Sequence, residues 1–208
     1  MNNHRDYHLR TAWGLLESTL PRSGTVVFCL AMGVALWAQT AQKGAKVADF
    51  RLADSTGRVH SLQSYSGKIV VLVFWSFKCP VALAYDDRLN DLQAKYGSKD
   101  VVILGVSSSG NETPEEVQRN ASNLRLSFPV LLDPDGTLAE SLGATHSPSV
   151  FILDQGGRLS YQGSLDNNRK PGDGARIPYA EDAIEQLLSG ATVTTPETKV
   201  FGCSLKRR

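Results

Sequence analysis

The feature that most constrains this chain is an uninterrupted apolar run from Ile69 to Trp75, with the sequence IVVLVFW. The run is rich in β-branched and aromatic residues and shows no polar alternation, which is typical of a strand covered on both faces of a sheet. A second such run, VVILGV, extends from Val101 to Val106. Strands buried on both faces need helices to cover them, so the pattern predicts an α/β domain with the first run as a central strand.

The rest of the chain supplies the helices and the remaining strands. Apolar residues recur at helical spacing from Val81 to Tyr96, and Gly97 is expected to end this helix. Turn residues, caps and periodicity predict the other elements: a small hairpin within residues 46–62, a helix from 114 to about 124, strands at 128–132, 149–154 and 158–163, and helices at 137–142 and 179–188. Alternating strands and helices that finish in an antiparallel hairpin predict one mixed sheet, and 208 residues are enough for one such domain.

The N-terminal region is expected to be an export segment. Residues 1–24 carry three arginines, and the stretch from Thr25 to Trp37 has no charged residue. That apolar stretch suits a secretory signal and is short for a membrane span. We therefore predict that residues 1–41 form an export signal or, if they are not cleaved, an N-terminal membrane anchor. The protein is then expected in the periplasm or at the outer face of the cytoplasmic membrane.

Composition argues against several classes of function. Lysine and arginine number 22 against 21 aspartate and glutamate residues, so the net charge does not favour a polyanionic partner. The four histidines are scattered along the chain, and glycine-rich phosphate-binding motifs are absent from the sequence. We therefore expect no nucleic-acid partner, no metal site and no cofactor.

Two cysteines, Cys79 and Cys203, would remain after removal of a leader that contains Cys29. Cys79 follows the central strand and precedes Pro80, which suits the first turn of a helix. At this position the unpaired N–H groups and the positive end of the helix dipole favour the thiolate over the thiol. The neighbouring Lys78 adds positive charge. Cys79 is therefore a candidate nucleophile, and the alternative is a small core residue without reactivity.

Several short motifs resemble the redoxin superfamily, which includes the alkyl hydroperoxide reductase/thiol-specific antioxidant proteins and the exported thioredoxin-like proteins. The motifs are Val47-Ala48-Asp49-Phe50, Thr56-Gly57, Leu62, Gly67 to Trp75, Cys79-Pro80, and SPSVFILD from Ser147 to Asp154. The last of these is similar to the family's cis-proline segment, which faces the active cysteine. The resemblance covers about residues 46–188. It implies a thioredoxin-like fold for a domain at 45–190, with the N-terminal hairpin as an extension and residues 191–208 as a tail.

The resemblance also implies where a substrate binds. A cis peptide bond between Ser147 and Pro148 would hold backbone groups ready to pair with an extended substrate beside Cys79. Pro80 is expected to border the same cleft, and His146 is a candidate proton carrier near neutral pH. The alternatives are an ordinary trans proline at 148 and a loop histidine without function at 146.

Two reactions of the superfamily compete, because neither pattern is complete. Peroxiredoxins have a threonine three residues before the reactive cysteine and a proline four residues earlier still; here Ser76 and Leu72 take those positions. The position of the peroxiredoxin arginine falls on Pro148. Thioredoxins carry a second cysteine three residues after the first, and here Ala82 replaces it, which leaves the motif Cys-Pro-Val-Ala at Cys79.

Cys203 is the candidate for the missing second thiol. The tail from Gly190 to Gly202 is long enough to cross a small domain, since an extended chain covers ~3.3 Å per residue. The Gly202-Cys203 ending is also similar to that of exported redoxins with a Cys-Pro-Val or Cys-Pro-Ile motif. A resolving or structural bridge to Cys79 is the favoured interpretation, and a mobile tail thiol or a link to another chain remains open.

These inferences predict a thiol-dependent oxidoreductase. Cys79 attacks a disulfide of a protein substrate, Cys203 or an outside thiol resolves the mixed disulfide, and an external thiol reductant resets the site. Peroxiredoxin-like reduction of a peroxide at Cys79, with the Ser76 hydroxyl assisting, is the first alternative. A redox-inert binding module with the same fold is the second.

Overall fold

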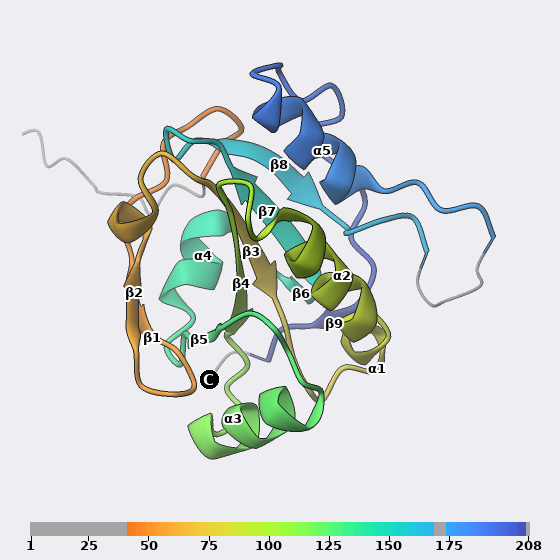
Figure 1. Ribbon diagram of the computed structural model, residues 1–208. Coiled ribbons are helices and arrows are strands. Elements are labelled where there is room, and N and C mark those ends of the chain that lie inside the picture. The colour runs from red at the N-terminus through yellow and green to blue at the C-terminus, as the bar shows by residue number, and fades with distance from the viewer. Residues whose placement is uncertain (1–40, 169–173, 207–208) are drawn as a thin grey trace, which may run out of the picture. The chain divides into compact units, whose positions relative to one another are not determined.

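The computed structural model describes residues 41–168 and 174–206, which all belong to one compact unit, residues 37–208 (Figure 1). Apart from Ala41, the predicted export segment lies outside the described residues. None of the helices in the described part of the chain is long and apolar enough to cross a bilayer.

A five-stranded mixed sheet forms the centre of this unit, with the strand order β5-β4-β3-β7-β8. The strands are β3 (Ile69–Phe74), β4 (Val101–Ser107), β5 (Val130–Leu132), β7 (Ser149–Leu153) and β8 (Leu159–Gly163). Strand β4 pairs in parallel with β3 and β5, whereas β7 pairs antiparallel with β3 and β8. The prediction that the IVVLVFW run forms the central strand of a mixed sheet is confirmed.

Strand β3 divides the hydrophobic core in two, because alternate side chains point to opposite faces of a sheet. Ile69, Val71 and Val73 lie in one apolar cluster, together with residues of α2 (Asp86–Tyr96) and α5 (Tyr179–Leu188). Val70, Leu72 and Phe74 lie in the other cluster, with residues of α4 (Thr137–Leu142). Helix α4 therefore covers one face of the sheet, and α2 and α5 cover the other (Figure 1).

The predicted single helix from residue 81 to 96 is wrong in its continuity. It is broken into α1 (Pro80–Leu83) and α2 (Asp86–Tyr96), with Ala84 and Tyr85 between them. Tyr85 is fully buried, and its hydroxyl donates a hydrogen bond of 2.5 Å to the carbonyl of Asn168. The backbone bends at this point because the large side chain is held by a residue that is distant in sequence.

The N-terminal hairpin forms as predicted, from β1 (Arg51–Ala53) and β2 (Val59–Ser61), followed by the short 3-10 helix η1 (Leu62–Tyr65). Asp54 closes its turn and accepts hydrogen bonds from Thr56 and from the buried His60. Burial alone would raise the pKa of Asp54, but these hydrogen bonds outweigh it and lower the pKa to about 2. The charged form of Asp54 is therefore part of the folded hairpin.

Helix α3 (Pro114–Asn123) begins with the predicted capping box. The Thr113 hydroxyl accepts a hydrogen bond from the backbone N–H of Glu116, and the Glu116 carboxylate accepts one from the backbone N–H of Thr113. This cap anchors the loop between β4 and α3, which carries Glu112 close to the candidate site.

The C-terminal tail is ordered against the domain, and its last strand is one that the sequence patterns do not predict. Strand β9 (Cys203–Ser204) pairs antiparallel with β6 (His146–Ser147). Before it reaches β6, the tail lies along the edge of β8, where the Thr198 N–H donates to the Gln162 carbonyl at 3.0 Å. The tail therefore links one edge of the central sheet to the segment that precedes Pro148.

Candidate active site

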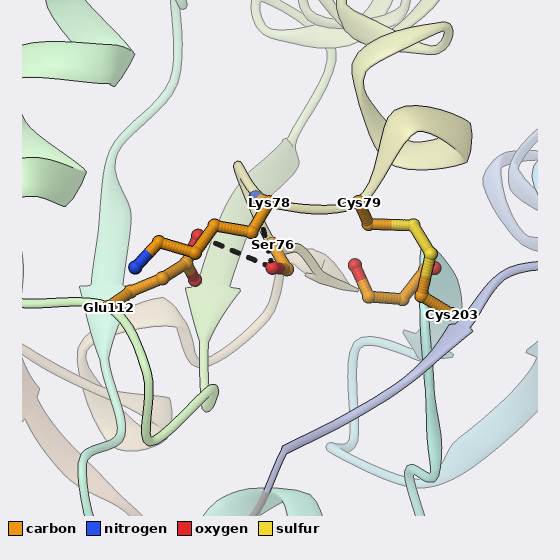
Figure 2. The surroundings of a disulfide bond; sticks show 6 residues. Ser76, Lys78, Cys79, Glu112 and Cys203 are labelled. Carbon is orange, nitrogen blue, oxygen red and sulfur yellow. Dashed lines mark hydrogen bonds between the residues drawn. A yellow bond between two sulfur atoms is a disulfide. The ribbon is translucent and has the colours of Figure 1, made fainter.

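A disulfide bond joins Cys79 to Cys203, which is 124 residues further along the chain (Figure 2). The two Cα atoms lie 5.9 Å apart, within the usual range for a disulfide. Cys79 is only 1% exposed, whereas Cys203 is partly exposed. Of the alternatives for Cys203, the structure therefore has the intramolecular bridge and no mobile tail thiol.

Cys79 is the residue at the N-terminal cap of α1, as the sequence predicts. Its N–H donates to the Ser76 carbonyl at 3.1 Å, and its carbonyl accepts a hydrogen bond of 3.1 Å from the Leu83 N–H. Pro80 takes the first helical position, where a missing N–H has no cost. Because α1 is a single turn, the dipole beside Cys79 is weaker than that of the long helix that the sequence predicts.

The peptide bond between Ser147 and Pro148 is cis, as predicted. The Cys79 Sγ atom lies 3.1 Å from the carbonyl oxygen of Ser147, so the cis-proline segment faces this cysteine. Both Ser147 and Pro148 are buried. The cis-proline segment therefore lies beside Cys79, as the resemblance implies, but it is covered in this disulfide-bonded state.

The cover is the chain's own tail. Ser147 pairs with Cys203 and His146 pairs with Ser204, so β9 takes the backbone edge predicted for an extended substrate. His146 also holds a 2.8 Å hydrogen bond between its Nδ1 atom and the Thr145 hydroxyl, and its side chain is half-buried. The structure thus brings His146, Ser147, Pro148 and both cysteines together at one place.

Ser76 lies in the loop between β3 and α1, three residues before Cys79. Its hydroxyl is directed at Glu112 rather than at the disulfide (Figure 2). The Ser76 hydroxyl donates to Glu112 Oε1 at 3.3 Å and accepts a 3.3 Å hydrogen bond from the Lys78 N–H. The Ser107 hydroxyl donates to Glu112 Oε2 at 3.2 Å. Glu112 thus fixes the loop that leads into Cys79.

Glu112 is a site residue that the sequence analysis missed. It is 7% exposed, and burial raises the pKa of its carboxyl although hydrogen bonds from Ser107, Ser76 and two backbone N–H groups oppose the rise. The sequence feature that could have indicated Glu112 is its position in the loop after β4. Strands β3 and β4 are parallel, so the loops that follow them lie at the same edge of the sheet.

Lys78 does not act on Cys79 in the way that the sequence suggests. Its ammonium group contacts the Asn111 carbonyl and lies 3.4 Å from Glu116 Oε2 on α3. The side chain therefore points away from the disulfide (Figure 2). Its positive charge is paired with Glu116, which leaves the neighbouring backbone and the cis-proline segment as the closest polar surroundings of Cys79.

No group of three or more histidine, cysteine, aspartate or glutamate side chains within residues 41–168 and 174–206 is arranged to hold a metal ion.

Residues 43–162 match the model of the AhpC/TSA family. The chain belongs to this family. It is 31% identical over 116 residues to the thiol-disulfide oxidoreductase ResA of Geobacillus thermodenitrificans, a match that covers 56% of this chain and 66% of that protein. The protein of the same name from Bacillus cereus is 28% identical over 137 residues, which cover 66% of this chain and 78% of that protein.

Solved structures give the same result for the fold. An uncharacterised conserved protein from Geobacillus kaustophilus superposes with a TM-score of 0.75 at 25% identity, over 82% of this chain and 94% of that one. A putative thiol:disulfide interchange protein DsbE from Chlorobium tepidum superposes with a TM-score of 0.58 at 25% identity. The superposition covers 74% of this chain and 99% of that one. The predicted thioredoxin-like fold and the predicted class, a thiol-dependent oxidoreductase of the redoxin superfamily, are confirmed.

Proposed function

We propose that this redoxin is an exported thiol-disulfide oxidoreductase in which Cys79 and Cys203 form the redox couple. The observation that carries the proposal is the Cys79–Cys203 disulfide beside a cis-proline segment. Relatives that bear the name thiol-disulfide oxidoreductase support the same reaction.

The catalytic cycle consists of two exchanges that each transfer two electrons. An external dithiol reductant breaks the Cys79–Cys203 bond, and it leaves as a disulfide while both cysteines become thiols. The Cys79 thiolate then attacks one sulfur of a substrate disulfide and expels the other sulfur as a thiol. The Cys203 thiolate attacks Cys79 in this mixed disulfide, which releases the second substrate thiol and restores the bridge.

The residues around the couple have separate roles in this cycle. The Ser147 carbonyl and Pro148 orient the substrate, because a cis proline exposes backbone groups to an extended chain. His146 and Pro80 border the same place, and His146 is the candidate to move a proton to a departing thiolate. Ser76 and Glu112 hold the loop before Cys79.

Export is part of the proposal because of the charge-free stretch from Thr25 to Trp37. Disulfides persist outside the cytosol, where this couple would meet protein disulfides and an external thiol reductant. The N-terminal segment would also provide membrane attachment if it were retained.

The test is a disulfide-reduction assay on the full chain, with insulin as substrate and dithiothreitol as reductant. We expect wild type to accelerate the reaction, Cys79→Ser to abolish the acceleration, and Cys203→Ser to accumulate a mixed disulfide on Cys79 that intact-mass analysis detects. Cys29→Ser is the matched control and should behave as wild type.

Hydrogen peroxide is assayed on the same samples to separate the alternatives. Rapid consumption of peroxide without disulfide reduction would replace the proposal by a peroxidase, which the engagement of the Ser76 hydroxyl with Glu112 does not favour. Failure of both reactions, with slow alkylation of Cys79 in the reduced protein, would leave a redox-inert binding module.

A further inference from the structure

The C-terminal segment from Phe201 to Lys206, called the strap from here on, lies where the proposed substrate must bind. Its residues Cys203 and Ser204 pair antiparallel with Ser147 and His146. Beyond this pair, the Leu205 N–H donates to the Thr145 carbonyl at 2.9 Å. The strap is therefore an extended, cysteine-containing peptide that is seated on the cis-proline segment.

The fit is tightest at Gly202, immediately before the cysteine. A Cβ atom added to Gly202 would lie closer to the carbonyl oxygen and carbon of Ser147 than real Cβ atoms come to other atoms, and it would also crowd the nitrogen of Pro148. Since both partners are backbone atoms of a buried segment, they cannot move aside as a flexible side chain would. Only glycine fits at the position before the cysteine.

The strap has a second anchor two residues after the cysteine. The Leu205 side chain is buried in the apolar cluster that also contains Phe74, Val106 and Ala144. The Lys206 carbonyl then accepts a 2.6 Å hydrogen bond from the Gly110 N–H. An apolar side chain at this position is therefore buried in the domain, whereas Ser204 between the two anchors is exposed.

The strap also explains why Cys79 is inaccessible. With the strap in place Cys79 is 1% exposed, and Ser147 and Pro148 are buried. Two extended peptides cannot pair with the same edge of β6 at the same time. A substrate can reach Cys79 only after the strap has left, so the two compete for one surface.

We propose that the strap is an internal copy of the substrate and that the groove selects extended peptides with glycine directly before the cysteine and an apolar residue two positions after it. This inference rests on the proposed function, because it names the substrate class of the same site. In the reaction, the Cys79 thiolate attacks the peptide cysteine of an activated disulfide, a Cys79–peptide bond forms, and the second sulfur leaves as a thiolate.

The experiment uses the full chain with Cys29→Ser and Cys203→Ser, which leaves Cys79 as the only thiol, and peptides whose cysteine is activated with thionitrobenzoate. The reference peptide is Lys-Val-Phe-Gly-Cys-Ser-Leu-Lys, the sequence of residues 199–206. Two variants replace its glycine by alanine or valine, and a third replaces its leucine by serine. Release of thionitrobenzoate gives the rate, each rate is divided by that of the peptide with glutathione, and intact mass verifies the adduct.

We expect the valine peptide to react about tenfold more slowly than the reference, because added carbons cannot be accommodated in a packed contact. The alanine and serine peptides should also be slower than the reference. Equal normalised rates for all four peptides, with normal reaction of the small disulfide 5,5′-dithiobis(2-nitrobenzoate), would overturn the inference and leave the proposed function intact. Loss of reaction with the small disulfide as well would instead count against the proposed function.

Competition by the strap is tested by adding Gly202→Ala to the protein with Cys29→Ser and Cys203→Ser. This change should displace the strap and raise the rate of the reference peptide about threefold or more, since a group that fills the site lowers the competent fraction. Gly156→Ala is the matched control, because its added carbon would meet only the Asp154 side chain, at 3.2 Å. An unchanged rate with Gly202→Ala would overturn the competition.

Discussion

At the scale of single residues, Glu112 is the side chain whose environment departs most from expectation at this site. Its carboxyl is buried beneath the loop that carries Cys79, and its hydrogen bonds to Ser76 and Ser107 hold that loop to β4. Burial raises its pKa above the usual value of 4.5. The folded protein therefore holds this proton more tightly than the unfolded chain does.

The raised pKa of Glu112 determines how the stability of the protein changes with pH. The contribution of Glu112 to stability is fully present below pH 4.5 and is lost as the pH rises through the higher pKa of the folded state. We expect Glu112→Gln to remove this loss, so the free energy of unfolding should decline less between acidic and neutral pH than in wild type. Urea unfolding of both proteins across this range is the measurement.

Glu115→Gln is the matched control for Glu112, because Glu115 is an exposed residue only three positions further along the chain. It should leave the pH dependence of wild type unaltered. A Glu112→Gln protein with the same pH dependence as wild type would show that the buried carboxyl does not couple to folding.

At the scale of elements, the loop between β4 and α3 depends on the capping box of α3. The reciprocal hydrogen bonds between Thr113 and Glu116 place the N-cap of the helix one residue after Glu112, so the cap determines where this carboxylate lies. The same helix end also supplies Glu116 as the partner of Lys78, which keeps that ammonium group away from Cys79.

Loss of this cap has a predictable cost. Thr113→Ala leaves the Glu116 N–H without its partner, and we expect the free energy of unfolding to fall by about 1 kcal/mol. Thr113→Ser should restore most of it, because the hydroxyl returns. Denaturant unfolding measures both. Ser122→Ala, near the other end of α3, is the control and should have little effect; a Thr113→Ala protein as stable as this control would contradict the role of the cap.

At the scale of the whole molecule, the Cys79–Cys203 bond closes a loop of most of the domain. It joins the N-cap of α1, in the loop after the central strand, to a tail that comes from the edge of β8. A cross-link across 124 residues removes much of the conformational freedom of the unfolded chain. If the two cysteines form the proposed redox couple, reduction should lower the stability of the fold as well as open access to Cys79.

Oxidised wild type should accordingly be more stable than the Cys203→Ser protein by about 4 kcal/mol, the size expected from chain entropy for a long loop. Urea unfolding without reductant gives the difference. Repeating the measurement on wild type with dithiothreitol is the control, because reduction should bring it close to the variant. Equal stabilities of oxidised and reduced wild type would show that the bond does not stabilise the fold.

The sequence by itself determined most of the helices and strands and the position of the candidate nucleophile Cys79. Burial of β3 on both faces, the hairpins, the cap at Thr113 and the position of Cys79 before Pro80 all follow from neighbours within a few residues, because periodicity and caps are local properties. The cis peptide bond before Pro148 could be predicted from the family motif around it.

Only the tertiary structure decided the break at Tyr85, the attachment of Ser76 to Glu112 and the strap on β6. These depend on partners 83, 36 and more than 50 residues away in the chain. No local pattern encodes such a partner, since the free energy of each contact arises only when folding brings two distant segments to the same edge of the sheet. The proposed substrate groove is covered by the strap for that reason.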